Sequence, residues 1–333
     1  MEKEVTMREL ARLLNLSVST VSKSLSDNHE ISKRTKKRVI EVAEALNYKP
    51  NYFASKLRRG TPKVIGVILP TILNPFYARL LTGIELTLSE QGYKMLALFS
   101  NDSQNKEIQC ISQLADGSIG GLIVCMAKET QLTKSKHHLT TWNNTNTETV
   151  YVDRFDGSLL KDQVVSNDYE STYKVCHDLI QNSSCKYIVF ASLMGKLTIE
   201  KLRYQGYKMA MSEKDLGKKI KTIRTRESLV FRQKLTSLIK QDRVDAIICT
   251  NESTINEVLH LFKNDHKLKT SKIPLVGFCG EHLKTLSEYP HLSIIDQNAA
   301  DLGKQAAKTL LKRISAKRPR AYRVYQVKSR ILK

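Results

Sequence analysis

The spacing of apolar residues changes once along the chain, near residue 60. Before that point apolar side chains recur every three or four residues, which predicts short helices. After it, continuous apolar runs such as 64–69 alternate with amphipathic stretches such as 76–91. A continuous apolar run is typical of a strand in a parallel sheet covered on both faces. The pattern therefore predicts a helical N-terminal domain followed by an α/β domain of parallel strand–helix units.

Three helices are expected in the first segment. Thr6 and Glu9 form a capping box that begins the first helix, whose buried face is formed by Met7, Leu10, Ala11 and Leu14. Asn15 tolerates the left-handed conformation that a tight turn between helices needs.

Ser17 caps a second helix that ends near Leu25. Its inner face is formed by Val21 and Leu25, and its outer face by Val18, Ser19, Ser22 and Lys23. Ser32 caps a third helix, which packs through Val39, Val42, Ala43 and Leu46 and ends at Asn47.

A fourth amphipathic stretch spans 51–59 and stops at Gly60. One to two turns are too few for a stable isolated helix. We therefore expect this stretch to fold only when it docks on another surface.

Strands and helices then alternate to the end of the chain. Strands are expected at 64–69, 93–99, 121–125, 149–152, 187–191, 245–249, 274–278 and 292–295. Helices are expected at 76–91, 105–115, 169–181, 198–212, 253–264, 281–287 and 299–314. These units are too many for one sheet of ordinary width, so two similar lobes are expected. The carboxyl ends of their strands would line the cleft between the lobes, where parallel sheets bind ligands.

Charge narrows the functional class. The 333 residues contain 54 Lys and Arg against 33 Asp and Glu, a net charge of +21. The first 60 residues carry +6 and the remaining 273 carry +15, so the excess per residue is largest in the N-terminal segment. A polyanionic partner such as DNA accounts for this excess. No apolar run is long enough to span a membrane, and no signal peptide is visible, so a cytoplasmic location is expected.

Catalytic and metal-binding motifs are not found. The six cysteines show no C-x-x-C pair and no zinc-like spacing with histidine, which predicts reduced, mostly buried thiols. The segment 194–198 resembles the end of a phosphate-binding loop, but Phe190 replaces the first glycine. His137 and His138 are expected in a solvated loop. We therefore expect neither an enzyme nor a cofactor or metal site.

The second helix and the turn before it carry the strongest functional signal. An exposed, outwardly polar helix of this size can enter the major groove with its first residues at base edges. Serine and threonine hydroxyls reach phosphates or bases, and Lys23 can reach a guanine acceptor or a phosphate. The basic run 33–38 begins the third helix and would contact phosphate. The alternative is a generic three-helix bundle with a solvated face.

These motifs closely resemble the start of LacI/GalR-type bacterial transcription regulators. The N-terminal matches are Val5–Ala11, Ser17–Lys23, Leu46–Asn51 and Ala54–Arg58. Further matches are Ile65–Pro70, Asn74–Phe76, Gly120–Ile123, Val152–Arg154, Arg203–Tyr207, Asp245–Ile247 and Val276–Phe278. The resemblance covers essentially the whole chain.

The resemblance implies a domain organisation and a partner. It implies a helix-turn-helix headpiece at 1–48, a hinge helix at 49–62 and a two-lobed domain, similar to periplasmic sugar-binding proteins, at 63–333. One lobe would comprise about 63–163 and 293–322, and the other about 164–292 and 323–333. A homodimer would bind a pseudo-palindromic, double-stranded DNA operator. The DNA-binding positions that match are Met7, Ser17, Val18, Ser19, Thr20, Ser22, Lys23, Ser32, Thr35, Tyr48, Asn51, Ala54 and Leu57. Of these, Leu57 would insert into the minor groove and kink the duplex.

A small-molecule effector, a sugar or sugar derivative, is implied for the cleft. The matching positions are Asn74, Phe76, Tyr77, Asp153, Arg203, Asn251, Cys279 and Gln297. The family usually has aspartate after Gly-Phe to bind sugar hydroxyls, whereas this chain has Cys279 and Gly280. Arg203 could instead form a surface or inter-lobe salt bridge, and Asp153 could be structural.

Three functions remain open at this point. The favoured one is an effector-controlled repressor that acts as a dimer rather than a tetramer. The others are a cytosolic sugar-binding protein without a DNA role, and a DNA-binding regulator that has lost small-molecule control.

Overall fold

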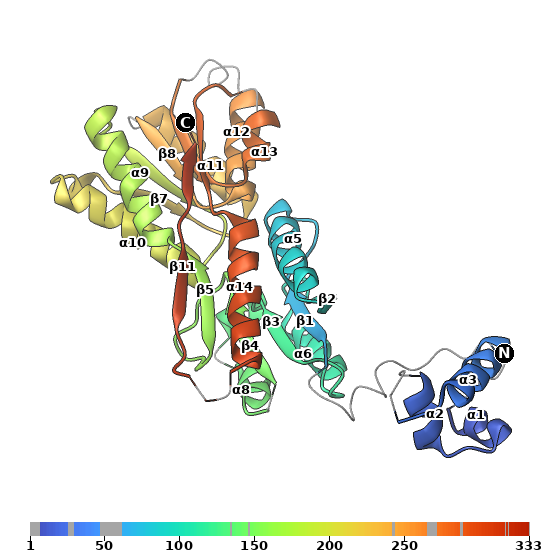
Figure 1. The fold of residues 1–333 in the computed structure, drawn as a ribbon. Helices are drawn as coiled ribbons and strands as arrows, with labels where there is room; N and C mark the ends of the chain where they lie inside the picture. The colour runs from blue at the N-terminus through green and yellow to red at the C-terminus, as the bar shows by residue number, and fades with distance from the viewer. Residues whose placement is uncertain are drawn as a thin grey trace. The chain divides into compact units, whose positions relative to one another are not determined.

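The computed structural model describes residues 7–25, 30–46, 62–133, 135–145, 147–241, 244–264, 272–286, 289–316, 318 and 320–332. The chain divides into two compact units, Met1–Pro62 and Lys63–Lys333. Each unit has its own hydrophobic core, and the two are described separately here (Figure 1).

The first unit contains a bundle of short helices around a small core. They are α1 (Met7–Leu14), α2 (Val18–Leu25) and α3 (Lys33–Ala45). The predicted apolar faces meet, since the buried residues are Leu10, Ala11, Leu14, Val21, Val39 and Ala43. Asn15 adopts the left-handed conformation expected of the turn, with φ of 51°. Thr6, the expected first cap, and Asn47, the expected end of α3, lie outside the described residues.

The second unit contains two six-stranded sheets, as expected for two similar lobes. The first sheet is parallel in the order β11-β5-β4-β3-β1-β2. The second has the order β12-β10-β9-β8-β6-β7, and only β12 is antiparallel to its neighbour. The strands are β1 (Val64–Leu69), β2 (Lys94–Phe99), β3 (Gly121–Val124), β4 (Glu148–Val152), β5 (Asp162–Ser166), β6 (Ile188–Ser192), β7 (Lys221–Arg224), β8 (Ala246–Cys249), β9 (Leu275–Phe278), β10 (Leu292–Asp296), β11 (Val324–Val327) and β12 (Arg330–Leu332). The α/β class with a helical head is therefore confirmed.

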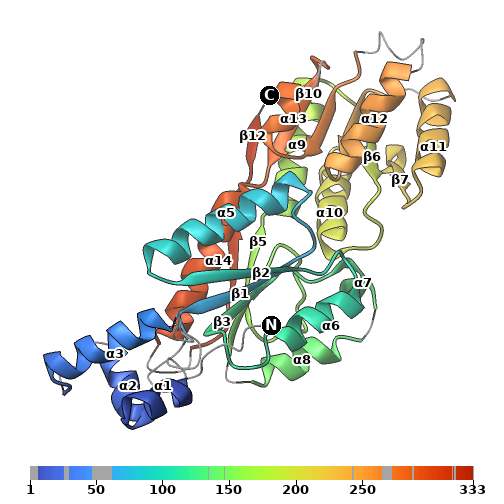
Figure 2. The same ribbon diagram turned by 90° about the vertical axis from the view of Figure 1, so that its right-hand side faces the viewer.

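Helices cover both faces of each sheet, which explains the continuous apolar strands. They are α5 (Pro75–Glu90), α6 (Gln104–Gln113), α7 (Lys128–Leu132), α8 (His137–Asn143), α9 (Asp168–Asn182), α10 (Thr198–Glu213), α11 (Ser228–Gln241), α12 (Glu252–Asn264), α13 (Glu281–Leu286) and α14 (Ala299–Ile314), with a 3-10 turn at Gly217–Lys219. In the first sheet, Ile65 and Val67 face the core shared with α5 and α14, while Ile68 faces the core shared with α6 and α8. The second sheet has α11 to α13 on one face and α9 and α10 on the other (Figure 2).

Every strand and helix that the sequence predicted in this unit is present, with ends shifted by one or two residues. The elements that sequence analysis missed are α7, α8, β5, β7, α11, β11 and β12. The missed strand β7 buries only Ile223 fully, and β11 has alternating exposed and half-buried residues. The solvated loop expected at His137 and His138 is wrong, because both residues belong to α8 and His138 contacts the buried carboxylate of Glu107. Local composition carries little signal for the short or polar elements among these, whereas α11 has apolar residues at helical spacing, at 231, 235, 238 and 239, that sequence analysis overlooked.

The chain crosses between the lobes at different residues from those expected. We define the first lobe by the sheet containing β1 and the second by the sheet containing β6. The expected boundaries at 163/164, 292/293 and 322/323 need correction, because all of β5 and β11 pair in the first sheet and all of β10 pairs in the second. The crossings therefore follow Ser166, Asp296 and Val327. Asp162 holds β5 in the first lobe through a two-point ion pair with Arg313 of α14, at 2.6 and 2.9 Å.

Helices α5 and α14 pack with their backbones in direct contact. A Cβ atom added to Gly83 would lie 2.0 Å from the carbonyl oxygen of Ala300, and one added to Gly303 would lie 2.1 Å from that of Leu80. Each helix thus has a glycine at the position where a backbone carbonyl of the other helix comes closest. This contact holds α14, which directly follows a crossing, against the first lobe.

We predict that Gly303→Ala destabilises the second unit. Although alanine favours a helix by up to about 1 kcal/mol, the new methyl group would force the two backbones apart. Overpacking of this kind typically costs about 1–3 kcal/mol, so the free energy of unfolding by urea should fall. Gly217→Ala is the control, because the nearest atom to its added Cβ is 3.8 Å away. Equal stability of the two variants would contradict the packing role of Gly303.

Candidate DNA-reading head and ligand pocket

Hydroxyl groups cluster at the start of α2. The Ser17 Oγ accepts a hydrogen bond from the Thr20 backbone N–H at 3.0 Å, which caps the helix as predicted. The same oxygen lies 2.7 Å from the Ser19 Oγ and 2.8 Å from the Thr20 Oγ1. A helix N-terminus with exposed hydroxyls is suited to phosphate and base-edge contacts.

Lys23 lies near the other end of α2. Its Nζ forms an ion pair with Glu30, and 39% and 52% of the two side chains are exposed. An exposed pair of this kind contributes at most about 1 kcal/mol. The ammonium group can therefore exchange Glu30 for an acceptor on DNA at little cost.

The start of α3 presents a second polar surface. Ser32 caps this helix as predicted, since its Oγ accepts from the Thr35 N–H at 3.2 Å and lies 2.8 Å from the Thr35 Oγ1. In the basic run 33–38, Lys33, Arg34, Lys37 and Arg38 are exposed. Exposed cations on the first two turns of a helix are suited to phosphate contacts.

Not every side chain expected to contact DNA faces outward. Val18 and Met7 are half-buried and pack against the head core, and Ser22 is also half-buried. The remaining expected DNA contacts, at Tyr48, Asn51, Ala54 and Leu57, lie outside the described residues.

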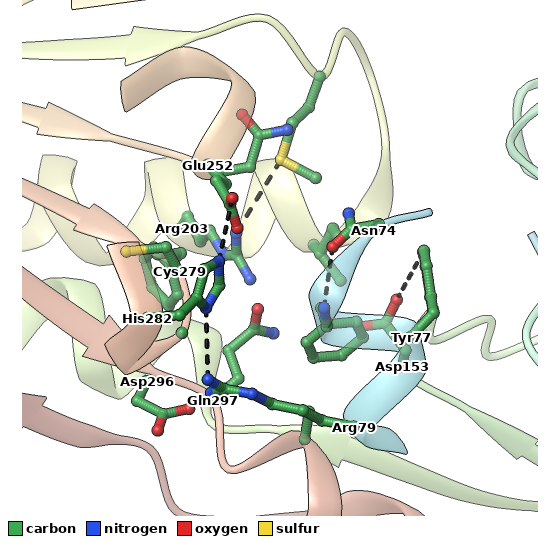
Figure 3. Close-up of a pocket in the computed structure, with 17 residues that line it drawn as sticks. Asn74, Tyr77, Arg79, Asp153, Arg203, Glu252, Cys279, His282, Asp296 and Gln297 are labelled. Atoms are coloured by element: carbon green, nitrogen blue, oxygen red, sulfur yellow. Dashed lines mark hydrogen bonds and ion pairs between the residues drawn. The ribbon is translucent and has the colours of Figure 1, made fainter. Parts of the chain in front are cut away.

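A pocket lies between the two lobes (Figure 3). All eight residues expected at the effector site line it, namely Asn74, Phe76, Tyr77, Asp153, Arg203, Asn251, Cys279 and Gln297. They come from the start of α5, the ends of β4, β8, β9 and β10, and the middle of α10. The carboxyl ends of the parallel strands bring them together, as the topology predicted.

Sequence analysis missed other residues that line the pocket, notably Arg79, Met194, Ile199, Glu252, Phe278, His282 and Asp296. Arg79 lies about one turn beyond the predicted group at the start of α5, and that spacing could have indicated it. His282 and Glu252 belong to the first turns of α13 and α12. No pattern in the sequence links these two residues.

Arg203 is the most buried cation of the pocket, with 1% of the residue exposed. Its Nε donates to the Asp168 Oδ1 at 2.6 Å, its Nη1 donates to the Thr250 carbonyl, and its guanidinium carbon lies 3.6 Å from the centre of the Phe278 ring. Its Nη2 is 2.6 Å from the same Asp168 oxygen but makes no hydrogen bond of acceptable geometry. The salt bridge is therefore neither at the surface nor between the lobes, as the alternative would have it, but buried within the second lobe, and the Arg203 Nη2 makes no hydrogen bond there.

Asp153 is the buried carboxylate of the first lobe. It follows β4 with a left-handed φ of 69° and accepts from the Tyr77 hydroxyl at 3.4 Å and the Cys125 thiol at 3.7 Å. Burial raises the pKa of Asp153 to about 6, although the neighbouring Arg154 opposes this shift. Arg154 is held by Asp102 at 2.5 Å and by the Tyr77 hydroxyl at 3.0 Å. Asp153 thus changes charge near neutral pH within the pocket.

A side-chain relay joins the lobes at the pocket. The Arg79 Nη2 of the first lobe lies 3.3 Å from the His282 Nδ1 of the second, and the His282 Nε2 lies 3.2 Å from the Glu252 Oε1 (Figure 3). Since a guanidinium can only donate, Nδ1 is the acceptor and Nε2 carries the proton. Neutral His282 therefore satisfies both partners.

The three crossing segments are bonded to one another. Gln297 donates to the Ser166 Oγ at 3.1 Å, and that hydroxyl donates to the Asp168 Oδ2 at 2.8 Å. The third segment is joined to the other two, because the Ser329 N–H donates to the Asn167 Oδ1 at 2.7 Å and the Asn298 Nδ2 donates to the Lys328 carbonyl at 2.7 Å. Gln297 and Arg203 thus connect the pocket to the segments about which the lobes can move.

Other kinds of site are not found within the described part of the chain. No group of three or more metal-binding side chains comes together there. No helix among those residues is long and apolar enough to cross a membrane. All six cysteines are buried free thiols, in agreement with the sequence.

Comparison with known proteins agrees with this architecture. Residues 6–51 match the bacterial regulatory proteins of the lacI family, and residues 62–331 match the periplasmic binding proteins and sugar binding domain of the LacI family. The HTH-type transcriptional repressor PurR of Aliivibrio salmonicida is 26% identical over 316 residues, which are 94% of this chain and 93% of PurR. The ribose operon repressor of Bacillus subtilis is 27% identical over 92% of this chain and 90% of that protein. The crystal structure of the Lac repressor dimer bound to operator and the anti-inducer ONPF has a TM-score of 0.78, with 16% identity over 99% of this chain and 98% of that one.

The head and the pocket together define a DNA-binding transcription regulator with a ligand-binding domain. The chain belongs to the LacI family of bacterial regulatory proteins. Its named relatives are transcriptional repressors, which are not enzymes.

We predict that the stability of Asp153→Asn relative to the unchanged chain increases with pH. Because the pKa of Asp153 is raised above its unfolded value of 3.8, protonated Asp153 stabilises the fold at low pH, and this contribution is lost as pH rises through about 6. Asparagine does not titrate and accepts a left-handed conformation. From pH 5 to pH 8 the difference in unfolding free energy should shift by about 1.4 kcal/mol in favour of the variant.

Urea unfolding at both pH values measures this difference. Asp215→Asn is the control, because Asp215 is also left-handed, with φ of 54°, but exposed. A difference for Asp153→Asn that is the same at both pH values would disprove the assignment.

Proposed function

We propose that the chain is a sequence-specific repressor that binds a pseudo-palindromic operator as a homodimer and releases or tightens it when a small molecule occupies the pocket between the lobes. The observation that carries this proposal is the lining of that pocket. Both lobes contribute to it, and Arg203 and Gln297 bond it to the crossing segments. A ligand there has different contacts when the lobes move, which is the requirement for control by a ligand.

The names of relatives support the same proposal. The HTH-type transcriptional repressor PurR and a ribose operon repressor align over more than 90% of this chain. A structure of similar fold is described as a dimer bound to operator and an anti-inducer. A coupling free energy of about 1–3 kcal/mol between pocket and operator would give a five-fold to 150-fold response.

Exposed apolar residues on the second unit support a dimer. Leu73, just before α5, is 89% exposed, and Leu86 on α5 is 57% exposed. Leu96 on the edge strand β2 is 42% exposed. Exposed apolar side chains on a helix and a sheet edge are suited to burial against a second copy.

The primary test is selection of DNA from a random pool by the full chain at moderate ionic strength. Enrichment of a symmetric sequence with two half-sites is expected from two heads in one dimer. If no symmetric sequence is enriched over random competitor, with or without candidate metabolites, the proposal is wrong.

Lys23→Ala is predicted to lower the preference for the selected operator over random DNA by about ten-fold, because a base contact contributes about 1–3 kcal/mol of discrimination. Lys37→Ala is the control, since Lys37 is exposed on α3 in the basic run. Its loss should weaken binding to both DNAs equally. Fluorescence anisotropy with the two duplexes measures both ratios. Equal losses on both duplexes for Lys23→Ala would assign Lys23 to phosphate contact alone.

Leu57→Ala is predicted to lose most operator affinity while keeping salt-sensitive binding to random DNA. A leucine wedge acts only where the duplex is kinked, whereas phosphate contacts act on any sequence. Leu160→Ala is the control, because Leu160 is 76% exposed in the second unit. Titrations on both DNAs at two salt concentrations provide the measurement, and unchanged operator affinity of Leu57→Ala would refute the wedge.

A further inference from the structure

We propose that the effector is a hydroxylated small molecule with one anionic group, a carboxylate or a phosphate, and that Arg79 binds this group. The inference rests on the proposed function of the pocket and specifies the chemistry of its ligand.

Arg79 is the pocket cation without an acidic partner. It is half-buried at the pocket, and no carboxylate of the described residues lies within ion-pair distance of it; its hydrogen bond is to the neutral His282 ring. In contrast, the buried guanidinium groups of Arg154, Arg203 and Arg313 each face an aspartate at 2.5–2.6 Å. Withdrawing a cation from water is costly unless a charge partner compensates it. An anionic ligand group would supply that partner.

Gly280 provides the space for this guanidinium. A Cβ atom added at position 280 would lie 2.5 Å from the Arg79 Nη1 and 2.8 Å from the His282 Nδ1. The residue that follows the replaced aspartate is thus the one that lets Arg79 approach the second lobe. Figure 3 shows Arg79 extending from α5 towards His282.

The other acidic groups of the pocket each have a neighbour in the protein that can pair with them. Asp296 lies 3.7 Å from Arg330, Asp153 lies beside Arg154 in the first lobe, and the Glu252 Oε1 lies 3.2 Å from the His282 Nε2. At position 279 a neutral thiol stands where the family usually has aspartate, and burial raises the pKa of Cys279 to about 12. A carboxylate that would repel an anion is therefore missing from the strand end beside Arg79.

Amide groups elsewhere in the pocket are suited to bind the hydroxyl groups of the proposed ligand. Asn74, Asn251 and Gln297 each use one end of the amide in a hydrogen bond within the protein. Among the described residues, no partner is found for the Asn74 Nδ2, the Asn251 Nδ2 or the Gln297 Oε1. Together with the Arg203 Nη2, these atoms supply both donors and an acceptor for a polyhydroxylated ligand.

Calorimetry of the full chain in 0.15 M NaCl tests the ligand class with matched probes. The probes are ribose with ribose 5-phosphate, glucose with glucose 6-phosphate and gluconate, and inorganic phosphate. At least one anionic probe should bind ten-fold or more tightly than its neutral counterpart. Gluconate against glucose 6-phosphate then distinguishes a carboxylate from a phosphate.

Variants test the assignment of residues. Arg79→Gln should reduce the preference for the anion to two-fold or less, and Gly280→Ala should weaken anion binding several-fold by displacing the guanidinium. Arg226→Gln removes the same charge from an exposed residue outside the pocket and should leave the preference unchanged. Thermal unfolding of each variant confirms that it is folded.

The inference is overturned by tighter binding of a neutral sugar, by an unchanged preference in Arg79→Gln, or by absence of heat with every anion including inorganic phosphate. Operator binding distinguishes this failure from that of the proposed function. Release of the selected operator by a neutral sugar would leave the regulator intact and remove only the anionic class. Absence of operator binding would refute the regulator, whatever the calorimetry shows.

Discussion

The hydrogen bonds among the three crossing segments are the constraint on which the rest of the second unit depends. Two lobes with separate cores need only short connections, and three such connections could move independently. Here Ser166, Gln297 and Asp168 bond the first two segments, and Asn167 and Asn298 bond both to the third. Displacing one segment would therefore break or stretch hydrogen bonds to the other two.

The pocket is coupled to this constraint through charge. Arg203 is buried by α10 and the second sheet, and its cost of burial is offset by Asp168, the first residue of α9. Asp168 in turn accepts from Ser166 at the first crossing. Because a buried charge must keep a partner, a ligand that draws on Arg203 also perturbs the crossing. Replacing Arg203 by alanine would leave Asp168 unpaired, so loss of response in that variant would mix binding with instability.

The sequence predicted the elements that depend on residues close to one another in the chain. Apolar runs such as 64–69 and caps such as Ser17 and Ser32 depend on near neighbours, and the structure has them within a residue or two. Strand β5 was missed because long-range contacts stabilise it: its first residue, Asp162, is buried by pairing with Arg313, about 150 residues later. A polar residue at such a site predicts a turn when only its neighbours in the sequence are considered.

The residues that line the pocket differ in the same way, since some are predictable from the sequence and others depend on long-range contacts. The eight expected residues follow strand ends or known motifs, so their convergence depends on topology alone. Arg79 and His282 meet across the lobes beside Gly280, and that relation spans about 200 positions. A glycine carries no local signal of which side chains will fill the space beside it. Contacts such as this one thus depend on pairwise fits across the lobes, whereas the location of the pocket follows from the order of the strands.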